Sequence, residues 1–399
     1  MEHPAPATSP LRATDRAELL DALRGFALFG VCLANLYGGF ALWGEPGAVP
    51  KASLPTAATD GAAAFLIRAL VEGKFYSLFS LLFGIGFAVQ LQRATARGDG
   101  QLRGYRRRLW VLLGIGLAHL LFIWPGDILA FYALVGWLLV RLRHLPDRAI
   151  FRWVGALLLL PVALWAVFWL GGGWQAAVPL TPAGPFYRMG EALDKPLGLT
   201  SFYAVVANSD WVVFMKTMRS GIFYRAGDLL FQWRVCKVLA MFLLGLWAGR
   251  HQLFRHPEAH GALLRRVAAG GLALGLAASL LNAWLDTGAA YQQGLAPGLA
   301  RAALYALGGA PLGRMALSCY LGQSLIALFL FTGLGLGWVG RVGPTLLWPL
   351  ALSIVGGQLL ACRWWLRRFE FGPAEWLWRS LSYGQRQPLR RALPAPTAG

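Results

Sequence analysis

Nine long apolar segments, separated by short polar ones, constrain the fold of this chain more than any other feature. These apolar runs are about 15 to 22 residues long, and a helix of roughly 20 residues crosses the hydrocarbon core of a bilayer. Because 57% of the residues are hydrophobic and only 14% are charged, we expect an all-α fold, a polytopic helical membrane bundle. The segments lie at about 20–43, 75–92, 109–124, 127–142, 149–170, 235–250, 266–285, 315–334 and 345–366.

Arginines gather between the apolar segments, at 91–108, 141–152 and 250–266 and after 366, and give a net charge of +19. Basic connecting segments face the cytoplasm, so we predict that both termini are cytoplasmic and that the chain is a multi-pass protein of the inner or plasma membrane. This orientation needs an even number of crossings, and we expect a tenth transmembrane helix at 299–312. We interpret the basic charge as a determinant of topology and of contact with membrane lipids, and we expect no binding to nucleic acid.

The other segments divide the chain into one membrane domain and two tails. We predict disordered tails at 1–19 and 386–399, and a single transmembrane domain over 20–385. The stretch 171–234 would form an outer loop region, in which 203–218 and 222–233 mix aromatic and charged residues as interfacial or re-entrant helices do. The oligomeric state stays open.

Three polar side chains, those of Asp21, Arg24 and Asn35, interrupt the first apolar segment. They fall within about 60° of one another on a helix, and polar groups inside a membrane span are costly and commonly functional. Arg24, roughly 6 Å from the inner end of the span, could hold a phosphate of a ligand that enters from the cytosol. The alternative is an ion pair between Asp21 and Arg24 that stabilises the start of the helix.

His119 is the only histidine within an apolar segment, and like Asn35 it would lie in the outer half of the membrane. A neutral imidazole there could act as a general base on an acceptor hydroxyl, or be a hydrogen-bonded packing residue. Asp127 follows Pro125 and Gly126 and could cap the next helix or orient His119, as a carboxylate orients a catalytic imidazole. His119, Asp127 and Asn35 are therefore the candidate catalytic residues.

Asp21, Arg24, Lys74, Arg314 and Gln323 are the candidates for binding a ligand. Arg314 and Gln323 bring a charge and an amide to one segment. For Lys74 the alternative to ligand binding is that its amine extends to lipid headgroups. The four cysteines lack paired spacing, and no phosphate-binding loop or metalloprotease motif is present. We expect no metal and no cofactor.

Five sequence blocks resemble those of a known family: LDALRGFALFGVCLANL at 20–36, KFYSLFSLLFGIGF at 74–87, GIGLAHLLFIWPGDILAFYAL at 114–134, GRMALSCYLGQSLI at 313–326 and FGPAEWLWRSLSYG at 371–384. This is the family of YeiB-like bacterial membrane proteins, catalogued as domain of unknown function 418, and the resemblance implies its fold. The first block is also similar to transmembrane acyltransferases, which move acyl groups from acyl-CoA onto sugars. Acyltransferase-three enzymes typically carry a catalytic histidine where this chain has Asn35.

These observations predict an acyltransferase that moves an acyl group from a cytosolic acyl-CoA-like donor, as a substrate, to an envelope or extracytoplasmic acceptor. Arg24 would hold the donor phosphate, His119 would be the base, Asp127 would orient it, and Asn35 would bind the oxyanion or the acceptor. The alternative is a small-solute transporter or channel without bond chemistry. A third possibility is a non-catalytic scaffold whose polar residues pair internally.

Overall fold

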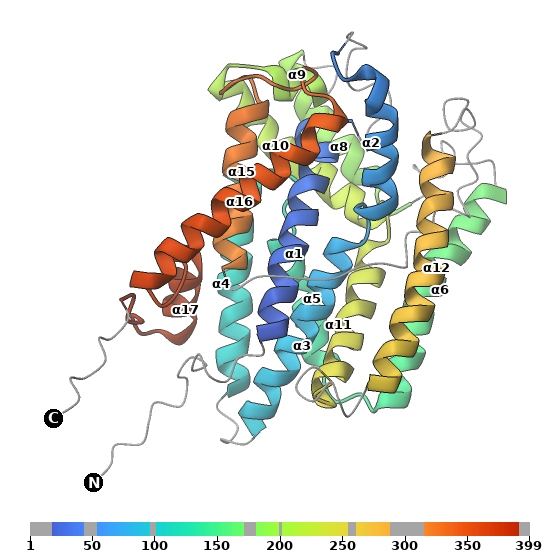
Figure 1. The fold of residues 1–399 in the computed structure, drawn as a ribbon, viewed down its shortest axis with the longest axis vertical. Coiled ribbons are helices and arrows are strands. Elements are labelled where there is room, and N and C mark those ends of the chain that lie inside the picture. The colour runs from blue at the N-terminus through green and yellow to red at the C-terminus, as the bar shows by residue number, and fades with distance from the viewer. Residues whose placement is uncertain are drawn as a thin grey trace.

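The computed structural model describes residues 18–43, 54–95, 101–170, 181–198, 202–253, 261–287 and 315–390. Within these ranges the chain is helical, without a strand, which confirms the all-α prediction for this part of the protein (Figure 1). The helices are α1 (Glu18–Ala34), the π-helical turn η2 (Asn35–Phe40), α2 (Ala57–Leu70), α3 (Phe75–Thr95), α4 (Gln101–Phe122), α5 (Leu129–Leu142), α6 (Asp147–Leu170), α8 (Gly184–Asp194), η4 (Lys195–Leu197), α9 (Phe202–Ala207), α10 (Trp211–Phe231), α11 (Arg234–Arg250), α12 (Gly261–Thr287), α15 (Ala316–Phe331), α16 (Pro344–Arg368) and α17 (Pro373–Tyr383).

Several helices are long and apolar enough to cross a membrane. In the described part of the chain, three spans satisfy this by length and composition, at Leu20–Phe40, Ala57–Gln92 and Pro344–Arg368. The pair α10 and α11 would add a fourth, bent by 67°. Large apolar side chains also point outward, such as Leu159 on α6 and Leu360 on α16, which are 68% and 67% exposed. An apolar exterior of this kind indicates a membrane protein, because water would penalise it.

Helix α3 is the central helix of the bundle. Its residues Leu78, Leu82 and Ile85 belong to a core shared with α1, η2, α2, α15 and α16. Phe87 and Ala88 belong to a second core, shared with α4, α5, α6 and α11. A helix that is apolar all round is expected to be buried, and α3 follows this rule by linking the two cores.

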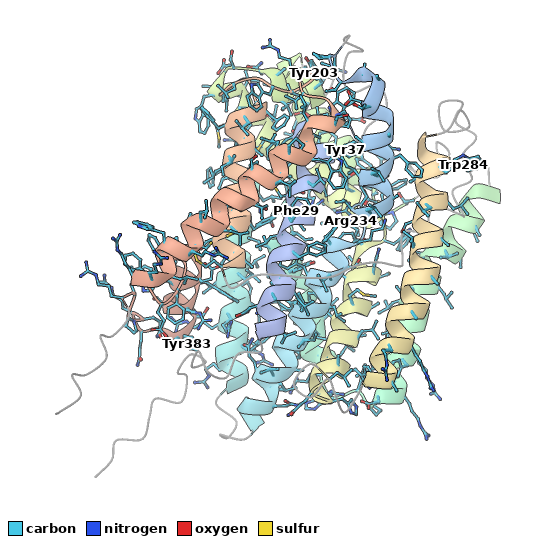
Figure 2. All side chains as sticks on the ribbon, viewed as in Figure 1. Phe29, Tyr37, Tyr203, Arg234, Trp284 and Tyr383 are labelled. Atoms are coloured by element: carbon cyan, nitrogen blue, oxygen red, sulfur yellow. The ribbon has the colours of Figure 1, made fainter. Side chains whose placement is uncertain are left out.

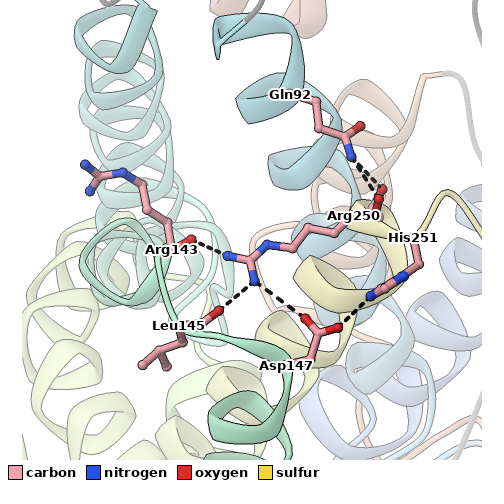
Figure 3. Close-up of polar contacts among 7 residues, drawn as sticks. Gln92, Arg143, Leu145, Asp147, Arg250 and His251 are labelled. Atoms are coloured by element: carbon pink, nitrogen blue, oxygen red, sulfur yellow. Dashed lines mark hydrogen bonds and ion pairs between the residues drawn. The ribbon is translucent and has the colours of Figure 1, made fainter.

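One end of the bundle is rich in basic residues. Arg250, at the end of α11, donates a 2.7 Å hydrogen bond to the carbonyl oxygen of Leu145, and Gln92 of α3 donates to the Arg250 carbonyl at 3.0 Å (Figure 3). In the same group, His251 Nε2 lies 2.7 Å from Asp147 Oδ2. These contacts bring together the ends of α3 and α11 with the connection between α5 and α6 and the first residue of α6.

Helix α17 lies near the beginning of α4. The guanidinium carbon of Arg108 lies 4.5 Å from the ring centroid of Trp378, and the indole N–H of Trp378 donates a 3.1 Å hydrogen bond to the backbone carbonyl of Arg108. Four of the predicted basic segments thus contribute residues to this end of the bundle. The sidedness and the number of crossings stay predictions.

The structure differs from the expected segments at three places. The helix α2 was not expected, because the segment 57–70 is shorter and less apolar than the others. A continuous α10 runs across the expected gap between 203–218 and 222–233. The first span does not continue as an α-helix to residue 43, because its last part is the π-helical turn η2.

Some predictions lie wholly or partly outside the described residues. These are the tenth crossing at 299–312, almost all of the N-terminal tail, and residues 391–399 of the C-terminal tail. The tail predicted from 386 begins with residues that contact the bundle. The carbonyl of Gln387 accepts a 2.8 Å hydrogen bond from Trp376, and Arg390 forms a bridge with Phe369.

Candidate functional site

His119 and Asp127 form a buried pair at the hairpin between α4 and α5. His119 Nδ1 lies 2.9 Å from Asp127 Oδ1, and the two side chains are 1% and 0% exposed. The other carboxylate oxygen, Oδ2, accepts a 2.7 Å hydrogen bond from the backbone N–H of Ala130 in the first turn of α5. One carboxylate therefore caps α5 and holds the imidazole at the same time.

The opposite nitrogen of His119, Nε2, is buried and has no hydrogen-bond partner within the described residues. A carboxylate at Nδ1 favours the tautomer with the proton on that atom, which leaves Nε2 as an acceptor. Burying a polar atom costs free energy unless another group bonds to it. The dyad thus presents a basic nitrogen, fixed by a carboxylate, to any hydroxyl group that reaches it.

Two more helices meet the dyad. The ring centroid of Tyr320 on α15 lies 5.2 Å from that of His119. Arg225 on α10 donates two hydrogen bonds to the carbonyl oxygen of Asp127, at 3.0 Å from Nε and 2.8 Å from Nη2. Residues from α4, α5, α10 and α15 therefore converge at this hairpin, although long stretches of chain separate them.

The first helix reaches the same hairpin through η2. Phe40 stacks on Trp124 with ring centroids 3.8 Å apart, and a Cβ atom added to Gly39 would come within 2.6 Å of the Trp124 ring. Asn35 begins this turn and is half-buried. No described hydrogen bond connects it to His119. A π-helical turn is uncommon and frequently lies at a functional site, so η2 belongs to the candidate site even though Asn35 does not join the dyad.

Asp21 and Arg24 lie at a different level of the bundle. Arg24 Nη1 is 2.8 Å from Asp21 Oδ1, so the helix-start ion pair is formed. Arg24 is about 16 Å from Asn35 along the helix axis, at roughly 1.5 Å per residue. The Arg24 side chain is 32% exposed and lies near Gly86 of α3, whereas that of Asp21 is 12% exposed.

The other candidate ligand residues have separate partners. Gln323 donates a 3.0 Å hydrogen bond to Oε1 of Gln358 on α16, which ties α15 to α16. Lys74 donates to the backbone carbonyls of Arg68 and Glu72, at 3.1 and 3.0 Å, in the turn between α2 and α3. Arg314 lies outside the described residues. No group of three or more His, Cys, Asp or Glu side chains within the described ranges has the arrangement of a metal site.

The sequence interpretation did not include Arg225 or Tyr320 in the site. Arg225 lies in the stretch 222–233, which was predicted as an interfacial or re-entrant helix, and Tyr320 lies in the apolar segment 315–334; neither residue has a local motif. The available signal for Arg225 was its charge, which lies in an aromatic stretch just before a long apolar segment. Such a charge needs a partner inside the bundle.

Comparison with known proteins places this chain in a family. Residues 300–385 match the family described as "Protein of unknown function (DUF418)". The chain is 30% identical to the uncharacterized protein YxaH of Bacillus subtilis (strain 168), in an alignment that covers 96% of this chain and 98% of YxaH. The chain belongs to the DUF418 family.

Two other relatives align over a similar share of the chain. The uncharacterized protein YeiB of Escherichia coli (strain K12) is 30% identical over 96% of this chain and 98% of its own length. An uncharacterized 39.9 kDa protein from the amylase 3' region of Bacillus acidopullulyticus is 29% identical over 95% of this chain and 97% of its own. No solved structure matches the chain significantly. The resemblance to YeiB-like proteins is confirmed, whereas acyl transfer stays a prediction.

Proposed function

We propose that this DUF418 protein is a multi-pass protein of the plasma membrane that transfers an acyl group from a cytosolic acyl-CoA-like donor to an acceptor hydroxyl in the envelope. The observation that supports this most is the buried dyad, in which Asp127 holds His119 and leaves Nε2 free to act as a base. A structural histidine with both nitrogens bonded would give no such support. About ten crossings, with both termini in the cytoplasm, would place the Asp21 and Arg24 level inside and the dyad towards the outside.

The proposed reaction needs only groups that are present in the chain and its two substrates. His119 Nε2 takes the proton of the acceptor hydroxyl while the oxygen attacks the thioester carbonyl carbon. The C–S bond then breaks, and the thiolate of CoA leaves with the proton returned from the imidazolium. Asp127 fixes the ring and stabilises its positive charge during transfer. Asn35 is the proposed hydrogen-bond donor to the oxyanion or the acceptor, and Arg24 the contact for a donor phosphate.

The test is transfer of a radiolabelled acetyl group. Inside-out membrane vesicles that contain the protein are given labelled acetyl-CoA, and label is followed into the envelope material of the vesicles. We expect labelling by the wild type and a loss of about 100-fold or more for His119→Gln, because general-base catalysis contributes on that order. Equal labelling by the two proteins, or none by the wild type above empty vesicles, would contradict acyl transfer.

A second candidate function is transport of a small solute without bond chemistry. It is favoured by the break between α10 and α11, whose axes differ by 67°, because discontinuous helices form the substrate sites of many transporters. Transport would be favoured if a labelled solute entered sealed vesicles at the same rate with the wild type and with His119→Gln. The acyltransferase would be favoured if label were transferred to envelope material without any flux of solute.

A further inference from the structure

Helix α16 leaves the bundle in its C-terminal half. Ile354 is its last fully buried residue, and the residues at 355–368 are half-buried or exposed. Leu360 and Trp364, one helical turn apart, are 67% and 52% exposed. Figure 1 shows this half of α16 running outward to the side of the bundle where α17 lies. Since α16 is long and apolar enough to cross a membrane, its outward apolar side chains are suited to contact with lipid tails.

Arginines follow this apolar surface at the end of α16. Arg363, Arg367 and Arg368 are exposed, and the first two lie one turn apart on the same side of the helix. The guanidinium carbon of Arg368 lies 4.9 Å from the ring centroid of Trp364. Apolar residues that give way to tryptophan and arginine are typical of the level where lipid tails meet lipid headgroups. We therefore expect the last turns of α16 to lie at headgroup depth.

Helix α17 presents apolar and basic groups beside the end of α16. Leu377 and Leu381 are 45% and 46% exposed, and their spacing of four places them on one face of the helix. The guanidinium carbon of Arg386, just after the helix, lies 5.8 Å from the ring centroid of Trp376. Figure 2 shows Tyr383, the last residue of α17, towards the edge of the molecule. A short helix with exposed leucines and neighbouring arginines is suited to lie in a membrane interface.

Other parts of the chain bring further arginines to α17. Beyond the helix, Arg390 forms an antiparallel bridge with Phe369, so the chain returns to the end of α16. On α4, Arg107 lies against the end of α17, since a Cβ atom added to Gly384 would come within 2.5 Å of its Nη1. We name this set of side chains the arginine rim, and it consists of Arg107, Arg363, Arg367, Arg368, Arg386 and Arg390.

The arginine rim carries positive charge that no described carboxylate neutralises. All of its members are exposed, and none of them forms an ion pair with an acidic side chain in the described part of the chain. Two acidic residues lie between or beside these arginines in the sequence. Glu375 is buried and binds the backbone N–H groups of Leu317 and Ser318, and Glu370 pairs with none of the rim arginines. The surface thus offers exposed guanidinium groups to an anion from outside the chain.

We propose that the arginine rim, together with the exposed Leu377 and Leu381, binds an anionic phospholipid. The headgroup phosphate accepts paired hydrogen bonds from guanidinium groups, and the acyl chains cover the leucines. A soluble phosphate would leave the leucines in water, and a zwitterionic lipid brings an ammonium group that opposes the arginines. Both parts of the surface are therefore satisfied by one ligand class. This site is separate from the dyad and does not depend on acyl transfer at His119.

The test measures lipid binding by the full-length protein with native mass spectrometry in detergent. Phosphatidylglycerol and phosphatidylcholine with the same acyl chains are titrated separately, and the apparent Kd of the first bound lipid is determined. The double variant Arg363→Gln/Arg367→Gln is compared with Arg148→Gln/Arg152→Gln, which removes two exposed charges with the same spacing at the start of α6. We expect only the α16 variant to lose about tenfold or more in affinity for phosphatidylglycerol, because each arginine beside an anionic lipid contributes about fivefold.

A soluble competitor tests whether the ligand is a lipid. Glycerophosphoglycerol has the headgroup of phosphatidylglycerol without acyl chains, and we expect it not to displace the lipid at equal concentration. The proposal is overturned if it displaces the lipid, if the wild type binds both phospholipids equally, or if the two double variants lose affinity to the same extent. Should the α16 variant fail to fold, Arg386→Gln carries the test, with an expected loss of about fivefold. His119→Gln should keep the preference for phosphatidylglycerol.

Discussion

His119 and Asp127 meet at 2.9 Å through Nδ1 and Oδ1, and the same carboxylate binds the first turn of α5 through Oδ2. The structural role of Asp127 and its proposed chemical role therefore rely on different oxygens of one side chain. Substitutions of Asp127 can keep an oxygen for the backbone N–H of Ala130 while removing the carboxylate that holds His119. The effect on stability can therefore be separated from the effect on activity by experiment.

Asp127→Asn and Asp127→Ala should differ in stability. Asparagine keeps an oxygen for the Ala130 N–H, whereas alanine removes the cap, at a cost of about 1 kcal/mol. We expect a clearly lower midpoint of thermal unfolding for Asp127→Ala, measured by circular dichroism in detergent. Both variants should lose transfer activity, because neither holds the imidazole as a carboxylate does. Equal unfolding midpoints for the two variants would show that the cap is unimportant.

Close packing of α3 on α11 depends on glycine. A Cβ atom at Gly245 would come within 2.1 Å of the carbonyl oxygen of Leu81, whereas a Cβ at Gly114 on α4 has no atom within 4 Å. We expect Gly245→Ala to reduce the yield of folded monodisperse protein in size-exclusion chromatography, as steric overlap with backbone requires. Gly114→Ala is the matched control and should be neutral or stabilising by up to about 1 kcal/mol, because alanine favours a helix. The opposite order of the two variants would contradict this helix packing.

Helix α17 stabilises the start of α15 through Glu375. Its Oε1 accepts hydrogen bonds from the backbone N–H groups of Leu317 and Ser318, at 2.7 and 3.0 Å, and its Oε2 binds the Ser318 hydroxyl. We expect Glu375→Ala to speed hydrogen exchange in the first turn of α15, with a loss of roughly 1 kcal/mol or more. Glu191→Ala, at an exposed position on α8, is the control. Unchanged exchange in Glu375→Ala would rule out the cap.

Cys319 and Cys362 should form a disulfide on mild oxidation. Their sulfur atoms lie 3.5 Å apart, between α15 and α16, and need to move to about 2.05 Å to bond. Cys32 and Cys236 are buried and should stay reduced. Mass spectrometry after alkylation should find one cross-link per molecule, absent in Cys319→Ala. A cross-link through Cys32 or Cys236 would contradict the packing of these helices.

The sequence predicted the helical class and most of the long helices because apolar length is a local signal. It did not predict η2, since nothing in the apolar run that contains Gly38 and Gly39 separates a π-helical turn from an α-helix. It also did not predict α2, which is stabilised partly by tertiary contacts such as that of Asp60 with the N–H of Thr345, 3.0 Å away on α16. A contact of this kind has no counterpart in local periodicity.

The candidate site was predictable where its residues are close in sequence. His119 and Asp127 are separated by one hairpin, and their pairing follows from the tight turn at Pro125 and Gly126. The additions of Arg225 and Tyr320 depend on how α10 and α15 pack, and no sequence pattern reports that.

The most direct test of the central claim, that Nε2 of His119 is the reactive base, is release of CoA thiol from acetyl-CoA by the purified protein. The protein is reconstituted in nanodiscs made with envelope lipid extract, and free thiol is followed over time for the wild type, His119→Gln and Arg152→Gln. We predict release by the wild type and Arg152→Gln and a loss of about 100-fold or more for His119→Gln. Thiol release by His119→Gln at the wild-type rate would contradict the account.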